Sequence, residues 1–220
     1  MGRGGRWVLL MGMLAVGLLL AAAPAQADTF SLTSDHCTGG CGTPPFGTVT
    51  VLQNGTTVDV TVSLAGTNQF VQTGAGDSMY FKFNGIGVAL ADITVNTPVG
   101  GRVLDAEQAA VPGGFNGDGT GDFTFGIDCD ACSNGVGGSA LPVGSSIVFH
   151  VANATIADLT GSNNKGNIFV ADILSGTTGN TGPVDVTGTP SVPEPSTLLL
   201  IGSGLVGLGA VRRFGARRRS

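Results

Sequence analysis

The sequence predicts an all-β fold, an antiparallel β-sandwich that is jelly-roll-like. Three observations support this prediction. Glycine is abundant, with 38 residues in 220, whereas helix-forming runs are scarce between the two ends of the chain. Many short segments alternate apolar and polar residues, which is the period of a half-buried strand. Glycine, asparagine and aspartate separate these segments, as the turns of exported β-sandwiches require.

The clearest local element is a hairpin. Its strands, Thr48–Gln53 and Thr56–Leu64, flank Asn54-Gly55, the strongest two-residue turn signal. In the second strand, apolar side chains alternate with polar ones, so one face should be buried and the other wet. The apolar side chains are Val58, Val60, Val62 and Leu64.

Seven further segments are strand candidates because they are apolar or alternate with period 2. They are Phe70–Thr73, Met79–Phe83, Val88–Val95, Phe123–Ile127, Ser146–Ile156, Ile168–Leu174 and Val184–Thr187. Asp105–Ala110 is predicted to form a brief helical turn. Ser175–Pro190 is rich in Gly, Thr and Pro and should hold one edge strand before it becomes a linker.

The N-terminus has the pattern of an export signal. Arg3 and Arg6 precede an apolar segment, Val8–Ala23, and Ala25-Gln26-Ala27 is a small-residue cleavage site. The mature chain should therefore begin at Asp28; an uncleaved membrane anchor is the alternative.

The C-terminus carries three elements in order. Val192, Pro193, Glu194 and Pro195 are followed by an apolar segment, Leu198–Val211. An arginine cluster completes the tail: Arg212, Arg213, Arg217, Arg218 and Arg219. The apolar segment is roughly 21 Å long as a helix, against a hydrocarbon core of about 30 Å, so it suits a temporary stop in the membrane. The arginines should remain cytoplasmic and the rest of the chain should lie outside.

This tail resembles the PEP-CTERM sorting signal of Gram-negative bacteria. The resemblance covers about 30 of 220 residues. It implies recognition by an exosortase in the inner membrane, processing near Pro-Glu-Pro, and an association with exopolysaccharide and the cell surface. A plain tail anchor is the alternative.

The mature region resembles a group of uncharacterised PEP-CTERM proteins. The residues that carry this likeness are Asp35–Gly42 and Phe46–Val51. The likeness supports the assignment to exported PEP-CTERM proteins and indicates no chemical activity.

The chain therefore divides into four parts. These are a signal peptide (1–27), a β-sandwich (28–174), an edge strand with a linker (175–191) and the sorting signal (192–220). Outside the two ends, only Lys82, Arg102 and Lys165 are basic, against 14 acidic residues. This acidic balance excludes nucleic acid and anionic membranes as partners of the mature region.

Four cysteines form two close pairs, Cys37 with Cys41 and Cys129 with Cys132. Export implies an oxidising compartment and therefore disulfides, most simply within each pair, although three connectivities are possible. Two alternatives remain. They are a zinc site made of the four thiolates with His36, and a thioredoxin-like redox role for Cys129 and Cys132.

A glycine-rich segment places oxygen side chains at alternate positions: Asn116, Asp118, Thr120 and Asp122. Calcium loops use this spacing for their first ligands, but Ile127 stands where the closing glutamate should be. The segment is either an ordinary turn or a weak calcium site to which Asp128 and Asp130 could contribute, and no other cofactor is indicated.

No motif for catalysis is present, so we expect a protein that is not an enzyme. The sequence lacks a Gly-x-Ser-x-Gly elbow, paired metal-binding histidines and a phosphate loop. His150 should face solvent on its strand. The hypothesis is an exported cell-surface or matrix protein with a structural or adhesive role linked to exopolysaccharide. A carbohydrate-binding module is the alternative and a secreted hydrolase the third choice.

Overall fold

Nearly every element of this protein is a β-strand. The computed structural model describes residues 26–72, 78–110, 114–129 and 142–186. The longer strands are β1 (Ala27–Asp35), β2 (Gly47–Asn54), β3 (Thr57–Leu64), β11 (Ser146–Ala152), β12 (Phe169–Leu174) and β13 (Thr181–Val186). The shorter ones are β4 (Gln69–Phe70), β5 (Phe81–Phe83), β6 (Ile93–Val95), β7 (Asp105–Gln108), β8 (Phe115–Asn116), β9 (Asp122–Phe123) and β10 (Phe125–Asp128).

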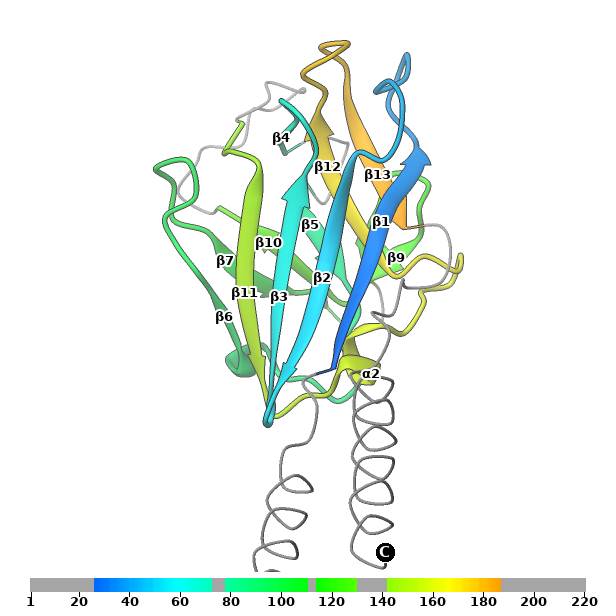
Figure 1. Cartoon of the computed structure of the whole chain (residues 1–220). Helices are drawn as coiled ribbons and strands as arrows, with labels where there is room; N and C mark the ends of the chain where they lie inside the picture. The colour runs from blue at the N-terminus through cyan, green and yellow to red at the C-terminus, as the bar shows by residue number, and fades with distance from the viewer. Residues whose placement is uncertain (1–25, 73–77, 111–113, 130–141, 187–220) are drawn as a thin grey trace, which may run out of the picture. The chain divides into compact units, whose positions relative to one another are not determined.

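Eleven of these strands form one antiparallel sheet in the order β6-β11-β3-β2-β1-β13-β12-β5-β10-β7, with β4 added beside β12. In Figure 1, β11, β3, β2 and β1 make the near layer, and β12, β5, β10 and β7 lie behind it. The two ends of the path, β6 and β7, lie close together without a ladder. The sheet is therefore a nearly closed barrel.

This arrangement confirms the prediction of an all-β, antiparallel fold but replaces the predicted sandwich with a nearly closed barrel. A sandwich has two separate sheets, whereas here β13 pairs with both β1 and β12 and joins the layers into one ladder. Curling the sheet onto itself leaves few exposed edges.

Phenylalanine fills the space between the layers. Ten of the eleven phenylalanines lie in the described ranges, and all ten are buried. The Phe83 ring lies 4.9 Å from that of Phe149, and Phe30 meets Phe169 edge to face at 5.2 Å. Alternate valines of β2 and β3 complete this core, as the strand pattern predicted.

The predicted hairpin is confirmed, but its turn is displaced by one residue. Asn54 is still paired, opposite Thr57, so the two turn residues are Gly55 and Thr56. Gly55 has φ +62° and Thr56 is not among the residues with positive φ. This is the pattern of a type II′ turn, in which only the first central position requires glycine.

The predicted helical turn at Asp105–Ala110 is wrong. Asp105–Gln108 forms β7, which pairs along its whole length with β10. So short a segment gains little as a helix, because the first turn costs more conformational entropy than its hydrogen bonds return. As a strand, the segment instead pairs with the backbone hydrogen-bonding groups on the open side of β10. The predicted strand Val88–Val95 also divides, into a 3₁₀ turn η1 (Leu90–Asp92) and β6.

Two strands that complete the barrel differ from the sequence predictions. No strand was predicted for Ala27–Asp35, yet β1 lies between β2 and β13. The edge strand expected within 175–191 is β13, an interior strand that lies between β1 and β12. β1 begins at Ala27, directly at the predicted cleavage site.

A short helix, α2 (Ile156–Leu159), packs near β2 at the end of the barrel seen at the bottom of Figure 1. Gln53 holds it, donating to Ala154 O and accepting from Ile156 N, each at 3.0 Å. The hydroxyl and backbone N–H of Thr155 both donate to Asp158, which lowers the pKa of that carboxyl.

Candidate functional site

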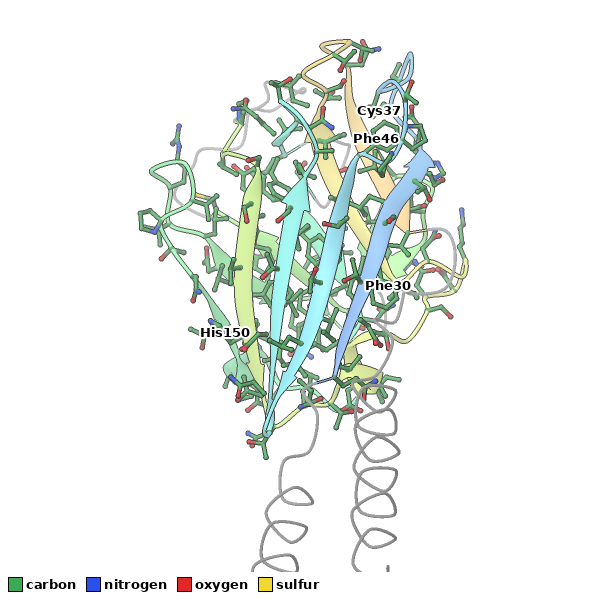
Figure 2. All side chains as sticks on the ribbon, in the orientation of Figure 1. Phe30, Cys37, Phe46 and His150 are labelled. Atoms are coloured by element: carbon green, nitrogen blue, oxygen red, sulfur yellow. A yellow bond between two sulfur atoms is a disulfide. The ribbon has the colours of Figure 1, made fainter. Side chains whose placement is uncertain are left out.

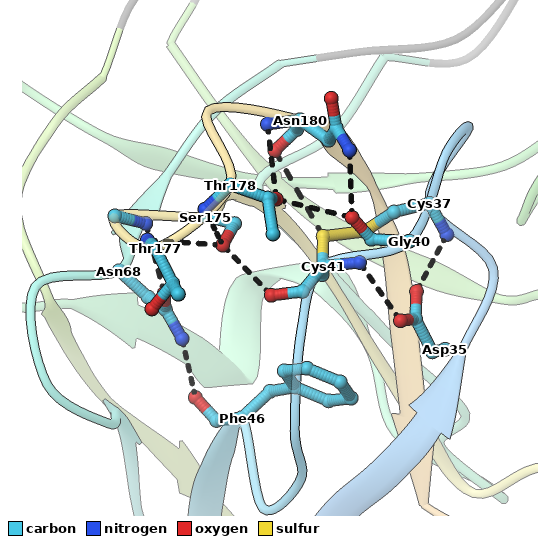
Figure 3. The surroundings of a disulfide bond; sticks show 11 residues. Asp35, Cys37, Gly40, Cys41, Phe46, Asn68, Ser175, Thr177, Thr178 and Asn180 are labelled. Carbon is cyan, nitrogen blue, oxygen red and sulfur yellow. Dashed lines mark hydrogen bonds between the residues drawn. A yellow bond between two sulfur atoms is a disulfide. The ribbon is translucent and has the colours of Figure 1, made fainter.

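The first candidate is the loop closed by a disulfide between Cys37 and Cys41, whose Cα atoms lie 5.5 Å apart (Figure 3). The Asp35 carboxylate organises this loop. It accepts from Cys37 N at 2.9 Å and from Cys41 N at 2.8 Å. Gly39 and Gly40 have φ of +87° and +81°, a conformation that glycine adopts without strain. The predicted local pairing is present here.

The disulfide loop is docked on the β12–β13 hairpin. Ser175 Oγ donates to Cys41 O at 2.8 Å. Thr178 Oγ1 and Asn180 Nδ2 donate to Gly40 O at 3.0 and 2.7 Å (Figure 3). The loop therefore links the β1–β2 connection to a hairpin more than 130 residues further along the chain, which is a structural role.

The zinc alternative does not fit these cysteines. Asp35, Cys37 and Cys41 do bring potential ligand atoms within 4.8 Å of one another. Their two sulfurs are bonded to each other, however, and a disulfide offers no thiolate to a metal. Cys129 is also disulfide-bonded and buried. Cys132, its expected partner, lies outside the described residues.

The second candidate is the glycine-rich segment predicted either as a turn or as a weak calcium site. It joins β8 to β9. Asn116 Oδ1 accepts from Asp118 N at 2.8 Å, and the buried Thr120 hydroxyl donates to Gly117 O at 2.6 Å. Asp118 has φ +49°, which aspartate tolerates in turns. Two of the four expected calcium ligands are thus engaged within the turn itself.

Donors from residues 163–167 occupy further oxygens of the same segment. Asn163 and Asn167 donate to Thr120 O at 2.8 and 2.7 Å. Asn164 Nδ2 donates to Asp122 Oδ2 at 2.8 Å, and Lys165 Nζ reaches Gly119 O at 3.0 Å. A lysine ammonium at this point competes with a metal cation. The geometry favours the turn. Asp128 lies elsewhere, buried beside Gln72, and Asp130 is outside the described residues.

A shallow hollow of about 210 Å³ adjoins this turn. Its polar lining includes Asn84, Thr124, Asn163 and Asn164. The amide of Asn84 already accepts from Thr124 and donates to Gly161 O. The asparagines of the 163–167 segment are bonded as described above. The hollow therefore offers a ligand few uncommitted polar groups.

The two histidines each meet a carboxylate. His150 faces outward from β11, as predicted, and its Nδ1 lies 2.6 Å from Asp59 Oδ1 on the neighbouring strand (Figure 2). His36 Nε2 lies 3.0 Å from Asp185 Oδ2 and 2.9 Å from Ser34 Oγ. Sequence reasoning missed this set, because Asp185 is 149 residues away from His36.

The Ser34, His36 and Asp185 side chains do not form a proton relay. A relay needs the serine and the carboxylate on different ring nitrogens, so that a proton can pass through the imidazole. Here both partners contact Nε2. The set is a partly buried hydrogen-bond cluster rather than an activated nucleophile.

The third candidate is the outer face of the near layer, which we call the hydroxyl face. Strand register places its side chains in rows across β1, β2, β3 and β11. One row is Ser31, Thr48, Ser63 and Ser146, and the next contains Thr29, Thr50 and Thr61. These side chains are at least partly exposed, and no described element crosses the face in Figures 1 and 2.

The sorting residues lie outside the described part of the chain. These are Val192 to Pro195, the apolar segment and the arginine cluster. Among the described residues, no helix is long and apolar enough to cross a membrane.

Comparison with known proteins identifies the tail. Residues 191–213 match the PEP-CTERM protein-sorting motif, which lies at the C-terminus as that signal requires. Searches of curated proteins and of solved structures found no match.

Proposed function

We propose that this PEP-CTERM sorting-signal protein is a structural or adhesive component of the cell surface, linked to exopolysaccharide. The motif by itself indicates an exported protein that passes through the membrane and is sorted by an exosortase-type enzyme. The proposal adds a Gram-negative host, an extracellular matrix as destination, and a barrel that acts without catalysis.

The sorting motif is the observation that carries the proposal. A protein sorted to the cell surface meets its surroundings through the outer surface of its folded domain. The disulfide at Cys37 and Cys41 suits an oxidising compartment outside the cytoplasm. The acidic balance of the mature region suits a soluble surface module.

The hydroxyl face supports an adhesive role. Thr50 and Thr61 lie directly opposite each other at the centre of that face. Neighbouring strands are about 4.8 Å apart, so the rows offer hydroxyl groups at regular intervals. A polymer that carries many hydroxyl groups could form many weak hydrogen bonds across such a surface. Asp59, the carboxylate on this face, is paired with His150.

Sugar stacking, the usual basis of a carbohydrate-binding module, is less well supported. It needs exposed aromatic rings. Within the described ranges, Tyr80 and all ten phenylalanines are buried. The proposed contact with polysaccharide therefore depends on hydroxyl groups and not on aromatic platforms.

The sorting step is tested by the intact mass of the protein from its native host, in the cell envelope and in the culture supernatant. The variant replaces Pro193, Glu194 and Pro195 with alanine. We expect a mature form from Asp28 to a position near Pro195, and its loss in the variant. A form that keeps Arg212 to Ser220 in both strains would show a plain tail anchor.

The adhesive step is tested by cosedimentation of the mature protein with exopolysaccharide from the host. Thr50→Lys or Thr61→Lys should weaken binding, because each places a long charged side chain in the middle of the hydroxyl face. Val103→Lys is the matched control, since Val103 is 65% exposed on the connection between β6 and β7. Equal binding by all variants would exclude the hydroxyl face as the contact surface.

A further inference from the structure

Lys82 on β5 and Asp172 on β12 form a fully buried ion pair. Their side chains are 2% and 1% exposed, and Nζ lies 3.0 Å from Oδ2. Strand register explains the contact. Lys82 is opposite Val170, so Asp172 is its diagonal neighbour on the same face of the sheet. This outer face points away from the aromatic core, because Phe81 and Phe83 on either side of Lys82 point into that core, and it is nevertheless buried around the pair.

A buried ion pair is a weak way to stabilise a sheet. Removing both charges from water costs about as much as their attraction returns, and apolar residues of similar volume often do as well. Lysine is seldom fully buried. The mature region has only three lysines and arginines, and one of them, Lys82, lies where its charge contributes little to the stability of the fold.

We propose that Lys82 and Asp172 join covalently through an amide bond between Nζ and Cγ. The proton on the ammonium passes to the carboxylate across the 3.0 Å contact, which leaves a neutral amine and a neutral acid. The amine lone pair attacks Cγ. The C–O bond then breaks, and one water molecule leaves with both departing protons. No oxidant, nucleotide or metal is required.

The surroundings favour this condensation in two ways. The paired strands β5 and β12 hold the two groups in reacting distance, which removes most of the entropic cost of bringing them together. Burial also restricts the access of water that would reverse the reaction.

Two more buried carboxylates lie diagonal to the pair on the same sheet. Asp128 on β10 is diagonal to Lys82, and Asp185 on β13 is diagonal to Asp172. Their side chains belong to the same outer face and are 6% and 1% exposed. This cross-link would join strands whose residues are 90 positions apart in the sequence.

The test is the intact mass of the exported protein, as processed at its two ends, after denaturation and reduction of its disulfides, compared with the sequence mass of the same residues. We expect a mass lower than the sequence mass by one water molecule, and a branched peptide that joins Lys82 to Asp172 after proteolysis. A protein at its full sequence mass, with the Lys82 amine open to acylation after denaturation, overturns the proposal. This measurement needs no variant.

Two variants identify the atoms. Lys82→Met should restore the full mass, whereas Lys165→Met, which removes an exposed lysine, should keep the deficit of one water. In Asp172→Asn the same bond would release ammonia in place of water. A deficit of one water in Asp172→Asn or in Lys82→Met would place the condensation elsewhere and contradict the assignment.

Discussion

The Asp35 side chain holds the disulfide loop in its conformation. Its two carboxylate oxygens each accept a backbone N–H from the disulfide loop, one from Cys37 and one from Cys41. Hydrogen bonds to a charged acceptor are the stronger kind. The loop then presents Gly40 O and Cys41 O to the β12–β13 hairpin. Asp35 therefore acts on the disulfide loop and, through it, on a distant hairpin.

We expect Asp35→Asn to lower the free energy of unfolding by about 1–3 kcal/mol, because an amide N–H would replace one acceptor opposite a backbone N–H. Asp118→Asn is the control, since it removes the same charge from an exposed turn. Urea denaturation of both variants measures the difference. Equal losses would mean that only net charge matters at Asp35.

The buried Tyr80 makes the stability of the folded protein depend on pH in the alkaline range. Burial and the nearby Asp128 carboxylate raise the pKa of Tyr80 to about 12, partly offset by Arg102. In the unfolded chain the pKa is about 10. Between these values the folded state retains a proton that the unfolded state loses. Stability should therefore fall as pH rises from about 10 to about 12, by about 2–3 kcal/mol in total.

Tyr80 is the only tyrosine in the chain, so phenolate absorbance reports on it directly. The expected result is little phenolate in the folded protein at about pH 11 and full ionisation in denaturant. Tyr80→Phe should remove this part of the alkaline destabilisation. A folded protein that ionises near pH 10 would contradict the buried position of Tyr80.

At the scale of single elements, the β2–β3 hairpin shows how far a local signal reaches. Asn54-Gly55 correctly predicted a two-residue turn, but the strands pair one residue further along. The cause is register, which places the valines of both strands in the core. Within this hairpin, only Gly55 has positive φ.

Substitutions in this hairpin distinguish the two possible turns. Gly55→Ala should destabilise by about 1–2 kcal/mol, because a Cβ is strained at φ +62°. Asn54→Ala should cost less, since Asn54 is an ordinary strand residue with one side-chain bond to Asp59. Thermal melts of both variants measure this order. A larger loss for Asn54→Ala would instead support a turn centred on Asn54.

At the scale of the whole molecule, β13 decides whether the barrel exists. It pairs with β1 on one side and β12 on the other, so without it the sheet would open in its middle. Open edges expose unpaired backbone groups and invite aggregation.

We therefore expect a chain of Asp28–Leu174 to lack a cooperative unfolding transition, whereas 28–192 should unfold cooperatively. Circular dichroism during heating tests both chains. A cooperative transition in the shorter chain would show that the domain ends where the sequence analysis placed its boundary.

Several features of the site could be predicted from local sequence. The close spacing of Cys37 and Cys41 indicated their pairing, and the alternation around His150 indicated an outward side chain. The contacts of His36 and Lys82 could not be predicted. Their partners, Asp185 and Asp172, are 149 and 90 residues away, and only strand pairing brings them together.

The sequence by itself determined the all-β class, the hairpin, the local disulfide and the sorting tail, because each depends on residues that are neighbours in the chain. Only the tertiary structure decided that the sheet closes into a barrel, that Asp105–Gln108 is a strand and that Lys82 is buried beside Asp172. The physical reason is that these features follow from pairing between distant strands. Such pairing satisfies backbone hydrogen bonds that no local pattern records.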